Sequence, residues 1–161
     1  MDSRIIVRPP LPEEASAVAA VQNTSWRETY SGLLSEQFYD DAALASRVRM
    51  WEQVLADGRQ SARVAEAEGE LIGVALAGPS VESDPVRAEQ LFVLYVRQDW
   101  HGSGAGSALL EAVLADRPAQ LWVAAENPRA RRFYERQGFR ADGAEVVDDD
   151  AEGLHEIRMV R

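Results

Sequence analysis

The chain has 161 residues and no cysteine, so it is long enough for one domain with a buried core and cannot form disulfides, thiolate metal sites or a cysteine nucleophile. Its 27 acidic and 17 basic residues give a net charge of −10, which disfavours nonspecific nucleic-acid binding, and the absence of lysine removes Schiff-base chemistry. No apolar run reaches the roughly 20 residues of a membrane-spanning helix, and no signal-peptide core is present, so we expect a cytoplasmic protein with one domain over 1–161.

The first half of the chain predicts a strand, two helical regions and a β-hairpin. Apolar positions recur at helical spacing in two stretches, and short apolar runs bounded by turn residues mark the strands. The expected strands span 4–8, 61–67 and 71–77, and the helical regions span 13–30 and 35–55, the second as one helix or two pieces. One face of the second region carries Leu44, Val48, Trp51 and Leu55.

The second half of the chain alternates strands with helices and ends in a hairpin. We expect strands over 88–96, 121–124, 140–147 and 154–160, and helices over 104–116 and 127–137. Asn127-Pro128 is typical of a helix start, and Gly138 is typical of a helix end. Because no repeat or linker interrupts this order, the sequence predicts one α+β domain with the order β-α-α-β-β-β-α-β-α-β-β.

The stretch from Leu91 to Leu110 joins a strand to a helix through a glycine-rich turn. Unpaired backbone N–H groups and the positive end of a helix converge on this turn, and its glycines let an anion approach closely. The turn therefore predicts a diphosphate site. A Walker A loop would need a lysine, and a Rossmann fingerprint would need glycine at Ser107 and a full doubly wound sheet behind it. An ordinary glycine-rich link between a strand and a helix stays open at this point.

Two motifs together resemble the Gcn5-related N-acetyltransferase (GNAT) superfamily. The run His101-Gly102-Ser103-Gly104-Ala105-Gly106 is similar to the family's turn of Gln or Arg, two residues, Gly, one residue, and Gly or Ala. Histidine replaces the usual Gln or Arg at the first position. The run from Asn127 to Phe139 is similar to the family's N-x-x-A-x-x-F-Y-x-x-x-G-F helix, and the order of elements matches over essentially the whole chain.

This resemblance implies a three-layer α/β/α arrangement of the acyl-CoA N-acyltransferase type, around a mixed, mostly antiparallel sheet with splayed central strands. It implies acetyl-CoA as co-substrate and no metal. Backbone groups of Leu94 and Val96 would pair with pantetheine, the Leu94 N–H would hold the thioester oxygen, and the turn amides would hold the diphosphate. The implied cofactor-binding residues are Leu94, Tyr95, Val96, His101, Gly102, Ser103, Gly104, Ala105, Gly106, Ser107, Asn127, Ala130 and Tyr134.

Tyr134 would lie beside the thioester sulfur as general acid. A phenol with an unperturbed pKa near 10 is protonated at neutral pH and can give its proton to a thiolate whose thiol has a pKa near 8.5. Two adjacent residues of a helix cannot both point fully inward, so we expect Phe133 in the core and Tyr134 in the cleft.

An amine acceptor must lose a proton before or during attack, because an alkylammonium has a pKa near 10.4. Glu89, at the start of the central strand, is the candidate catalytic base, with Glu126 and a water chain to solvent as the alternatives. The remaining candidates are assigned to solvated loops or to structural roles: Glu68, Glu70, Glu82 and His155.

The acceptor is expected to be a small-molecule amine or a peptide or protein amine, with no nucleic-acid or membrane partner. Trp26 and Tyr30 are the candidate substrate-binding residues, with Arg27 and Tyr39 nearby, although Trp26 and Tyr30 could equally pack in a helix core. The loops 78–86 and 148–153 would complete the acceptor site. Without a cysteine nucleophile, direct transfer in a ternary complex is expected. A non-catalytic acyl-CoA-binding module is the alternative, and similar proteins are commonly homodimers.

Overall fold

The computed structural model describes residues 4–161. Its strands are β1 Ile6–Arg8, β2 Ser61–Ala67, β3 Glu70–Pro79, β4 Glu89–Val96, β5 Gln120–Ala124, β6 Arg140–Asp148 and β7 Leu154–Val160. Its helices are α1 Ala15–Tyr30, α2 Asp41–Asp57, α3 Ala105–Leu114 and α4 Pro128–Arg136, with short 3-10 turns at Pro12–Glu14, Glu36–Phe38, Gln98–Trp100 and Asp149–Ala151. Within these residues, no helix is long and apolar enough to cross a membrane.

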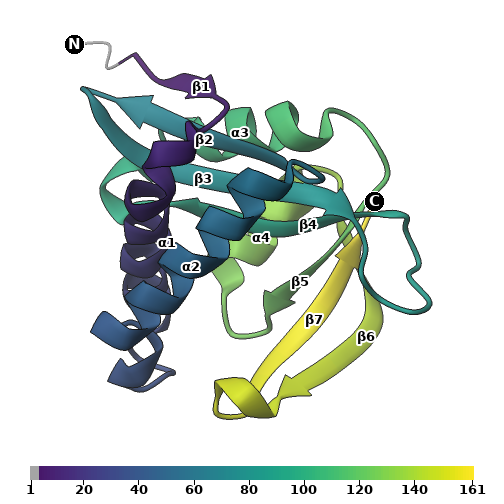
Figure 1. The fold of residues 1–161 in the computed structure, drawn as a ribbon. Helices are drawn as coiled ribbons and strands as arrows, with labels where there is room; N and C mark the ends of the chain where they lie inside the picture. The colour runs from purple at the N-terminus through teal and green to yellow at the C-terminus, as the bar shows by residue number, and fades with distance from the viewer. Residues whose placement is uncertain (1–3) are drawn as a thin grey trace.

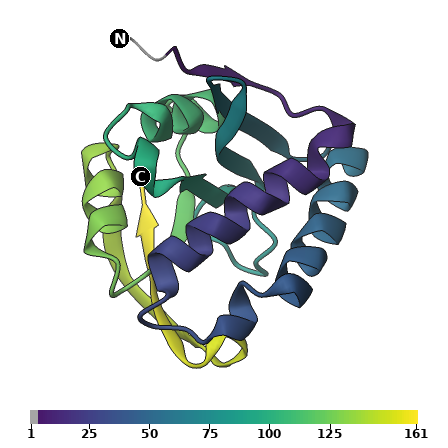
Figure 2. The ribbon, with the colours of Figure 1, turned by 90° about the vertical axis from the view of Figure 1, so that its left-hand side faces the viewer.

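The seven strands form one mixed sheet in the order β1-β2-β3-β4-β5-β7-β6. All neighbouring strands are antiparallel except β4 and β5, which run parallel. Helices α1 and α2 cover one face and α3 and α4 cover the other, so the molecule has three layers (Figures 1 and 2). The expected α+β class and three-layer arrangement are confirmed.

Each face of the sheet has its own apolar core. On one face, Val18 and Trp51 from α1 and α2 pack on Val64 and Val74 of the sheet, and Leu44, Val48 and Leu55 join them as the spacing predicted. On the other face, a second cluster is built from strand residues and from α3 and α4: Ala65, Ile72, Ala75, Leu91, Leu109, Leu110, Val113, Leu121, Tyr134 and Phe139. The alternation of side chains along each strand supplies both faces from the same segments.

The parallel strands β4 and β5 separate soon after they begin (Figure 1). In the described chain their only register pair is Gln90 with Gln120, and from there onward the two strands diverge. The expected splay of the central strands is therefore present.

The junction of β4 and β5 is fixed by buried amide side chains. Gln120 is fully buried, and its Nε2 donates to Glu82 Oε2 at 2.7 Å and to Gln90 Oε1 at 3.1 Å. Its Oε1 accepts from the Arg87 backbone N–H at 3.0 Å, and Ser80 Oγ donates to Gln90 Oε1 at 2.8 Å. This network holds the strands together at one end and places the divergence beyond it.

The predicted elements are all present, with small differences at their ends. The region expected over 35–55 is two pieces, a 3-10 turn and α2, because Asp40 caps a new helix by accepting from the Ala43 N–H at 2.9 Å. The strand expected over 4–8 begins only at Ile6, which pairs with Glu66 next to the end of β2 at Ala67.

Candidate functional site

A cleft of about 650 Å³ occupies the space between the diverging strands. Strands β4 and β5, the glycine turn, α4 and the C-terminal end of α1 form its walls. All of the predicted cofactor-binding residues except Ser103 line it: Leu94, Tyr95, Val96, His101, Gly102, Gly104, Ala105, Gly106, Ser107, Asn127, Ala130 and Tyr134. Ser103 instead accepts a hydrogen bond from the Ala105 N–H within the turn, at 3.3 Å.

Strand β4 offers free backbone groups to this cleft. The Arg97 N–H donates to the Ile72 carbonyl at 2.9 Å, and from there the antiparallel pairing with β3 alternates between bonded and non-bonded pairs. Leu94, opposite Ala75, and Val96, opposite Gly73, fall in the non-bonded positions. Their N–H and C=O groups therefore point away from β3, toward the cleft, where β5 does not pair with them.

A β-bulge in β4 precedes these groups. Val93 pairs with Leu76 and Leu91 pairs with Ala77, which leaves Phe92 as an extra residue on β4. A bulge of this kind increases the local twist and bends its strand. The bulge lies where β4 diverges from β5, and so it coincides with the opening of the cleft.

The glycine turn has the backbone geometry that only glycine adopts easily. Gly102 and Gly104 have φ values of +80° and +92°, and Gly104 is the residue that precedes α3. Gly104 has no side chain to cap this helix, and apart from the Ala105 N–H, which donates to Ser103, the first backbone N–H groups of α3 stay available to an anion. Gly106 is needed for packing, because a Cβ there would lie 3.3 Å from the Phe133 ring of α4.

Helix α4 adds positive charge to the cleft, which the sequence analysis did not predict. Its residues Arg129, Arg132 and Arg136 are exposed and line the cleft, one helical turn apart from each other. Asn127 Oδ1 accepts from the Ala130 N–H at 3.1 Å and so caps the helix, as expected. Gln137 Nε2 donates to Ser107 Oγ at 3.0 Å and ties α4 to the start of α3. The three arginines make a basic wall on an acidic protein.

His101 lines the cleft and is also bonded to the end of β4. Its Nε2 lies 2.9 Å from the Val96 carbonyl oxygen, and because a carbonyl can only accept, the ring donates this hydrogen bond. The imidazole thus fastens the turn to the end of β4 and occupies one of the two free backbone groups of Val96.

Three tyrosines meet at the centre of the cleft, from α1, β4 and α4. Burial, and then the neighbouring Tyr30, raise the pKa of Tyr134 well above its usual value. Burial also raises the pKa of Tyr95, with smaller contributions from Tyr30 and Tyr134. All three lie on the cleft wall and keep their hydroxyl protons at neutral pH.

The expectation that Phe133 lies in the core and Tyr134 in the cleft needs correction. Tyr134 is the more buried of the two at 8% exposure, Phe133 is half-buried, and both line the cleft. The reason is aromatic packing: the Tyr134 ring lies edge-on to Phe139 at 5.8 Å and to Phe133 at 5.3 Å. Tyr134 belongs to the core and also lines the cleft, as expected.

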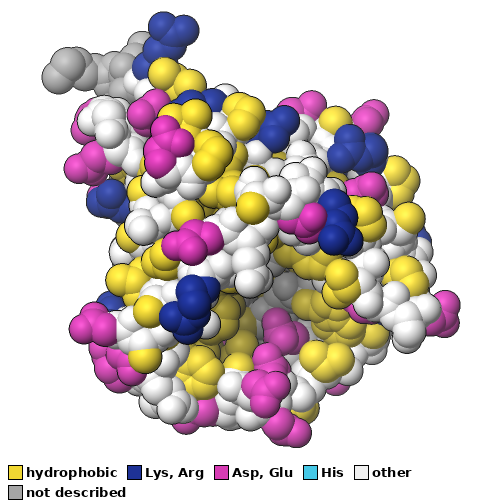
Figure 3. Space-filling view, viewed as in Figure 1, with side chains coloured by type: hydrophobic (Ala, Val, Ile, Leu, Met, Phe, Trp, Pro, Cys, Tyr) yellow, Lys and Arg dark blue, Asp and Glu magenta, His cyan; other side chains and the backbone are white. Residues whose placement is uncertain are grey.

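A second pocket, of about 210 Å³, opens on the α1/α2 face and shares part of its wall with the first. Tyr30, Leu91, Phe92, Tyr95 and Trp122 line both, so the two spaces meet between the diverging strands. The other lining residues are Trp26, Gln90, Asp148, Leu154 and Glu156. Figure 3 shows a hollow over β5 in this view, bordered by apolar and acidic side chains.

Trp26 and Tyr30, the candidate substrate-binding residues, both line this second pocket. Their rings are 4.8 Å apart, and Tyr30 is buried while Trp26 is half-buried, so both also pack in a core. Arg27 and Tyr39 do not line either pocket. Arg27 pairs with Glu36 at 2.6 Å, and the Tyr39 hydroxyl donates to the Tyr30 carbonyl at 3.2 Å, so both brace the end of α1.

The structure does not bring Glu89 or Glu126 to either pocket. Glu89 starts β4 opposite Pro79, at the closed end of the splay, and Glu126 is exposed before α4. His155 is exposed and pairs with Glu145 at 3.2 Å.

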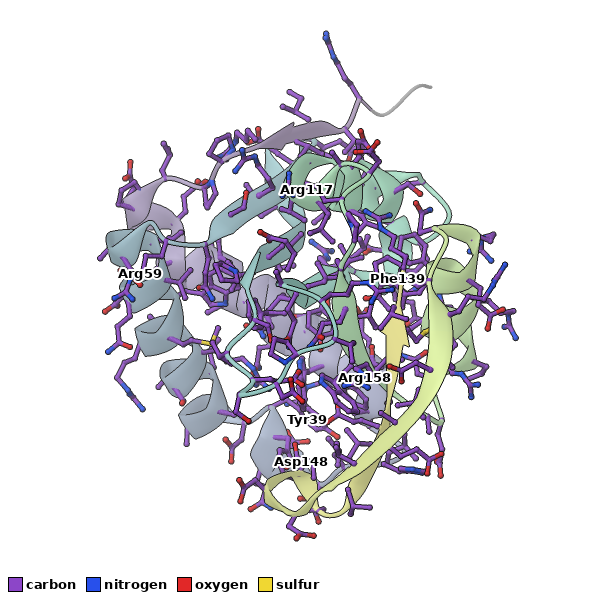
Figure 4. The ribbon with its side chains drawn as sticks, turned by 90° about the vertical axis from the view of Figure 1, so that its right-hand side faces the viewer. Tyr39, Arg59, Arg117, Phe139, Asp148 and Arg158 are labelled. Carbon is purple, nitrogen blue, oxygen red and sulfur yellow. The ribbon has the colours of Figure 1, made fainter. Side chains whose placement is uncertain are left out.

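Glu82 is not a solvated loop residue. It is half-buried, and its Oε2 accepts from the Trp122 indole N–H at 2.9 Å as well as from Gln120. Three carboxylates do line a pocket in the described residues: Glu28 of α1 lines the cleft, and Asp148 and Glu156 line the second pocket. Asp148 begins the loop 148–153, which was expected to complete the acceptor site, whereas nothing in the sequence pointed to Glu28 or Glu156. Figure 4 shows Asp148 at the end of β6, beside the hairpin turn, with Arg158 further along β7.

The chain is similar to known acetyltransferases over nearly its full length. Residues 23–160 match the family model of the acetyltransferase (GNAT) domain. A probable N-acetyltransferase of Mycobacterium tuberculosis is 32% identical over 149 residues, which cover 88% of this chain and 83% of that protein. A 5-NmdU N-acetyltransferase of Pseudomonas phage PaMx11 is 31% identical over 144 residues, covering 86% and 89%.

Solved structures share the fold. The PaiA N-acetyltransferase from Thermoplasma acidophilum, in complex with coenzyme A, superposes with a TM-score of 0.69 at 20% identity and covers 98% of both chains. A GCN5-related N-acetyltransferase from Rhodopseudomonas palustris gives a TM-score of 0.72 at 23% identity and covers 100% of this chain and 97% of its own. On the match to the domain and to these relatives, the chain belongs to the GNAT family of acetyltransferases.

Proposed function

We propose that this N-acetyltransferase binds acetyl-CoA in the cleft between β4 and β5 and transfers the acetyl group directly to a primary amine. The observation that carries the proposal is the coincidence, in one cleft, of three different recognition surfaces. These are the outward backbone groups of Leu94 and Val96, the amide-rich start of α3, and the arginines of α4. The first matches the pantetheine arm, and the other two match the phosphates of the same molecule.

The residues present fit acetyl-CoA. Pantetheine carries amide groups, which pair with the free backbone edge of β4 as a strand would. The diphosphate is an anion, which suits the uncapped N-terminus of α3 and the glycines that let it approach. Arg129, Arg132 and Arg136 supply charge for the phosphates, because guanidinium groups bind phosphate oxygens well. When bound, acetyl-CoA supplies the activated acetyl group as a thioester.

Leu94 and Tyr134 would perform the chemistry on the thioester. The Leu94 N–H points into the cleft and can donate to the carbonyl oxygen as negative charge develops on it. Tyr134 keeps its proton at neutral pH and can donate it to the departing sulfur. The raised pKa makes Tyr134 a weaker acid than free phenol, but a thiolate that leaves into the same buried cleft is a stronger base as well.

The relatives support the class of reaction. Two proteins at 31–32% identity over more than four fifths of this chain are named as N-acetyltransferases, and one solved structure of this fold was obtained with coenzyme A. The absence of a cysteine leaves no thiol to carry an acetyl group between donor and acceptor. The relatives thus favour acetyl transfer, and the lack of cysteine favours direct transfer in a ternary complex.

Calorimetric titration of the full chain with acetyl-CoA, ATP and NAD tests the binding. We expect saturable binding of acetyl-CoA and none of comparable affinity for ATP or NAD. Release of free CoA thiol in the presence of a panel of primary amines tests the reaction. Tight acetyl-CoA binding with no amine acetylated would favour an acyl-CoA-binding module, and failure to bind acetyl-CoA would contradict the proposal outright.

A further inference from the structure

The second pocket holds two carboxylates in an aromatic enclosure. Trp26, Tyr30, Phe92, Tyr95 and Trp122 supply five aromatic side chains, and Asp148 and Glu156 supply the charge. No basic side chain is among its lining residues in the described chain. Aromatic faces and carboxylates both attract cations, so the pocket is complementary to an ammonium group on an apolar body.

Glu156 lines this pocket from β7. It is on β7 opposite Ala124 of β5 and Val146 of β6, and its side chain shares a face of the strand with Leu154 and Arg158. It is close enough to Tyr30 to raise the pKa of that phenol. Because Tyr30 also lines the cofactor cleft, Glu156 lies beside the place where the two pockets meet.

The charged groups around Glu156 leave its pocket negative. Asp148 on β6 is a second carboxylate, and Tyr30 on α1 and Tyr95 on β4 are neutral phenols. Arg158 stacks over Trp122 at 5.6 Å and is paired with Asp142 at 2.7 Å. Arg47 of α2 lies over Trp26 at 4.8 Å and donates to the Phe38 carbonyl at 2.7 Å. Burial, and then the charge of Asp148, raise the pKa of Glu156 above its usual value.

We propose that the second pocket binds the acceptor as a compact arylalkylammonium ion, and that Glu156 is the catalytic base that accepts its proton. The volume of 210 Å³ is below the roughly 300–1,000 Å³ of pockets for drug-sized ligands, so the acceptor is small. The five aromatic walls favour an aromatic body, which stacks on them. This inference rests on the proposed acetyl transfer and names its acceptor class and its base.

The proton balance of the reaction is met by residues of the chain. The ammonium nitrogen gives one proton to Glu156, which frees its lone pair for attack on the thioester carbonyl carbon. A C–N bond forms, the C–S bond breaks, and Tyr134 gives its proton to the sulfur. The nitrogen loses its second proton to Glu156 once that group has passed the first to solvent, and Tyr134 regains a proton from solvent. The net products are an amide, a thiol and one proton.

Ligand binding tests the pocket without relying on turnover. The probe is 2-phenylethylamine, titrated into the complex of the full chain with CoA, with the uncharged 2-phenylethanol as its isostere. We expect the wild type to bind the amine at least about tenfold more tightly than the alcohol, since charged hydrogen bonds and cation–aromatic contacts both favour it. Glu156→Gln should remove most of that preference, and Glu52→Gln, the same change at an exposed position of α2, should keep it.

The pH dependence of acetylation tests the base. We expect kcat/KM for 2-phenylethylamine to fall as the pH decreases through the raised pKa of Glu156, because the carboxylate becomes protonated and can no longer accept a proton. Asp148→Asn should move this acid limb to lower pH, since it removes the negative charge that helps raise the pKa. Glu156→Gln should remove the limb and lower kcat by about 100-fold or more.

The outcomes separate this inference from the proposed function. Acetyl-CoA should bind Glu156→Gln within about twofold of the wild type, because the substitution lies outside the cofactor cleft. If acetyl-CoA does not bind the wild type, the proposed function fails. The inference alone fails under either of two results: equal binding of amine and alcohol by the wild type, or an acid limb that neither substitution moves. The Asp148→Asn shift decides the matter if Glu156→Gln does not fold.

Discussion

At the scale of single residues, Tyr134 shows how burial sets a chemical role. The Tyr134 ring is buried against Phe133 and Phe139. Tyr134 also lines the cleft, where it lies close to Tyr30 and Tyr95. Desolvation disfavours the phenolate, so the group is kept as a proton donor at every physiological pH. As the proposed general acid, Tyr134 would contribute to the departure of the thiolate and much less to the binding of CoA.

Tyr134→Phe tests that role. We expect acetyl-CoA affinity within about twofold of wild type, because the ring and its packing remain, and a kcat that is about tenfold or more lower, because the proton donor is lost. Calorimetry measures the first and CoA thiol release the second. Tyr39→Phe is the matched control: it removes a hydroxyl that bonds the Tyr30 carbonyl and should reduce stability while leaving kcat nearly unchanged. Equal kcat values for Tyr134→Phe and wild type would exclude Tyr134 as the acid.

The residues predicted from the sequence succeed or fail according to how locally they are determined. The positions of Gly104 and Asn127 could be predicted because a glycine turn and a helix cap are determined by neighbouring residues in the sequence. Glu89 was chosen as base from its place in the central strand, but the side chain lies at the closed end of the splay. Glu156, the proposed base, had no local signal, since β7 inserts between β5 and β6 and so reaches the pocket only through long-range pairing.

At the scale of elements, the splay of β4 and β5 is the feature that makes a site out of a sheet. Two parallel strands with a continuous ladder would bury the backbone groups of Leu94 and Val96 in hydrogen bonds. The Gln90–Gln120 pair holds the strands at one end, and the Phe92 bulge turns β4 away. The sequence showed the apolar strands, but a bulge and a divergence depend on register, which no short pattern determines.

Gln120→Ala should loosen the closed end of the splay. The substitution removes three hydrogen bonds and leaves the Arg87 N–H without its partner, while Glu82 still accepts from Trp122 and Gln90 from Ser80. We expect the free energy of unfolding to fall by about 2–4 kcal/mol, since three hydrogen bonds of a buried network are lost and one buried N–H is left unpaired. Urea unfolding measures it, and Gln53→Ala, at an exposed position of α2, should change it by less than about 0.5 kcal/mol. A similar small change for both variants would show that the network does not hold the strands.

At the scale of the whole molecule, the charge near the cleft differs in sign from the net charge of the chain. The chain has a net charge of −10, yet α4 turns Arg129, Arg132 and Arg136 toward the cofactor cleft, while the smaller pocket on the other face holds Asp148 and Glu156. Glu28 also lines the cleft, but the three arginines outnumber it, so the two sides of the splay attract opposite charges. This separation suits an anionic donor that enters from the α3/α4 side and a cationic acceptor that enters from the α1/α2 side.

Arg132→Glu tests the basic wall. We expect acetyl-CoA to bind about three- to tenfold more weakly at low salt, and the loss of affinity with added salt to be smaller than in the wild type, because one attractive charge has become repulsive. Arg49→Glu makes the same charge change at an exposed position of α2 outside both pockets. If the two variants weaken binding equally, only the net charge matters and α4 has no specific role.

The central claim is that the cleft holds the thioester against the free edge of β4, and leucine-selective ¹⁵N labelling tests it most directly. The amide resonance of Leu94, assigned by Leu94→Met, should move downfield when acetyl-CoA binds, because its N–H then donates to the thioester carbonyl. Free CoA, which lacks that carbonyl, should move it much less, while leucines of α3 such as Leu109 respond alike to both. A Leu94 amide that is indifferent to the acetyl group, in a chain saturated with acetyl-CoA, would contradict the account.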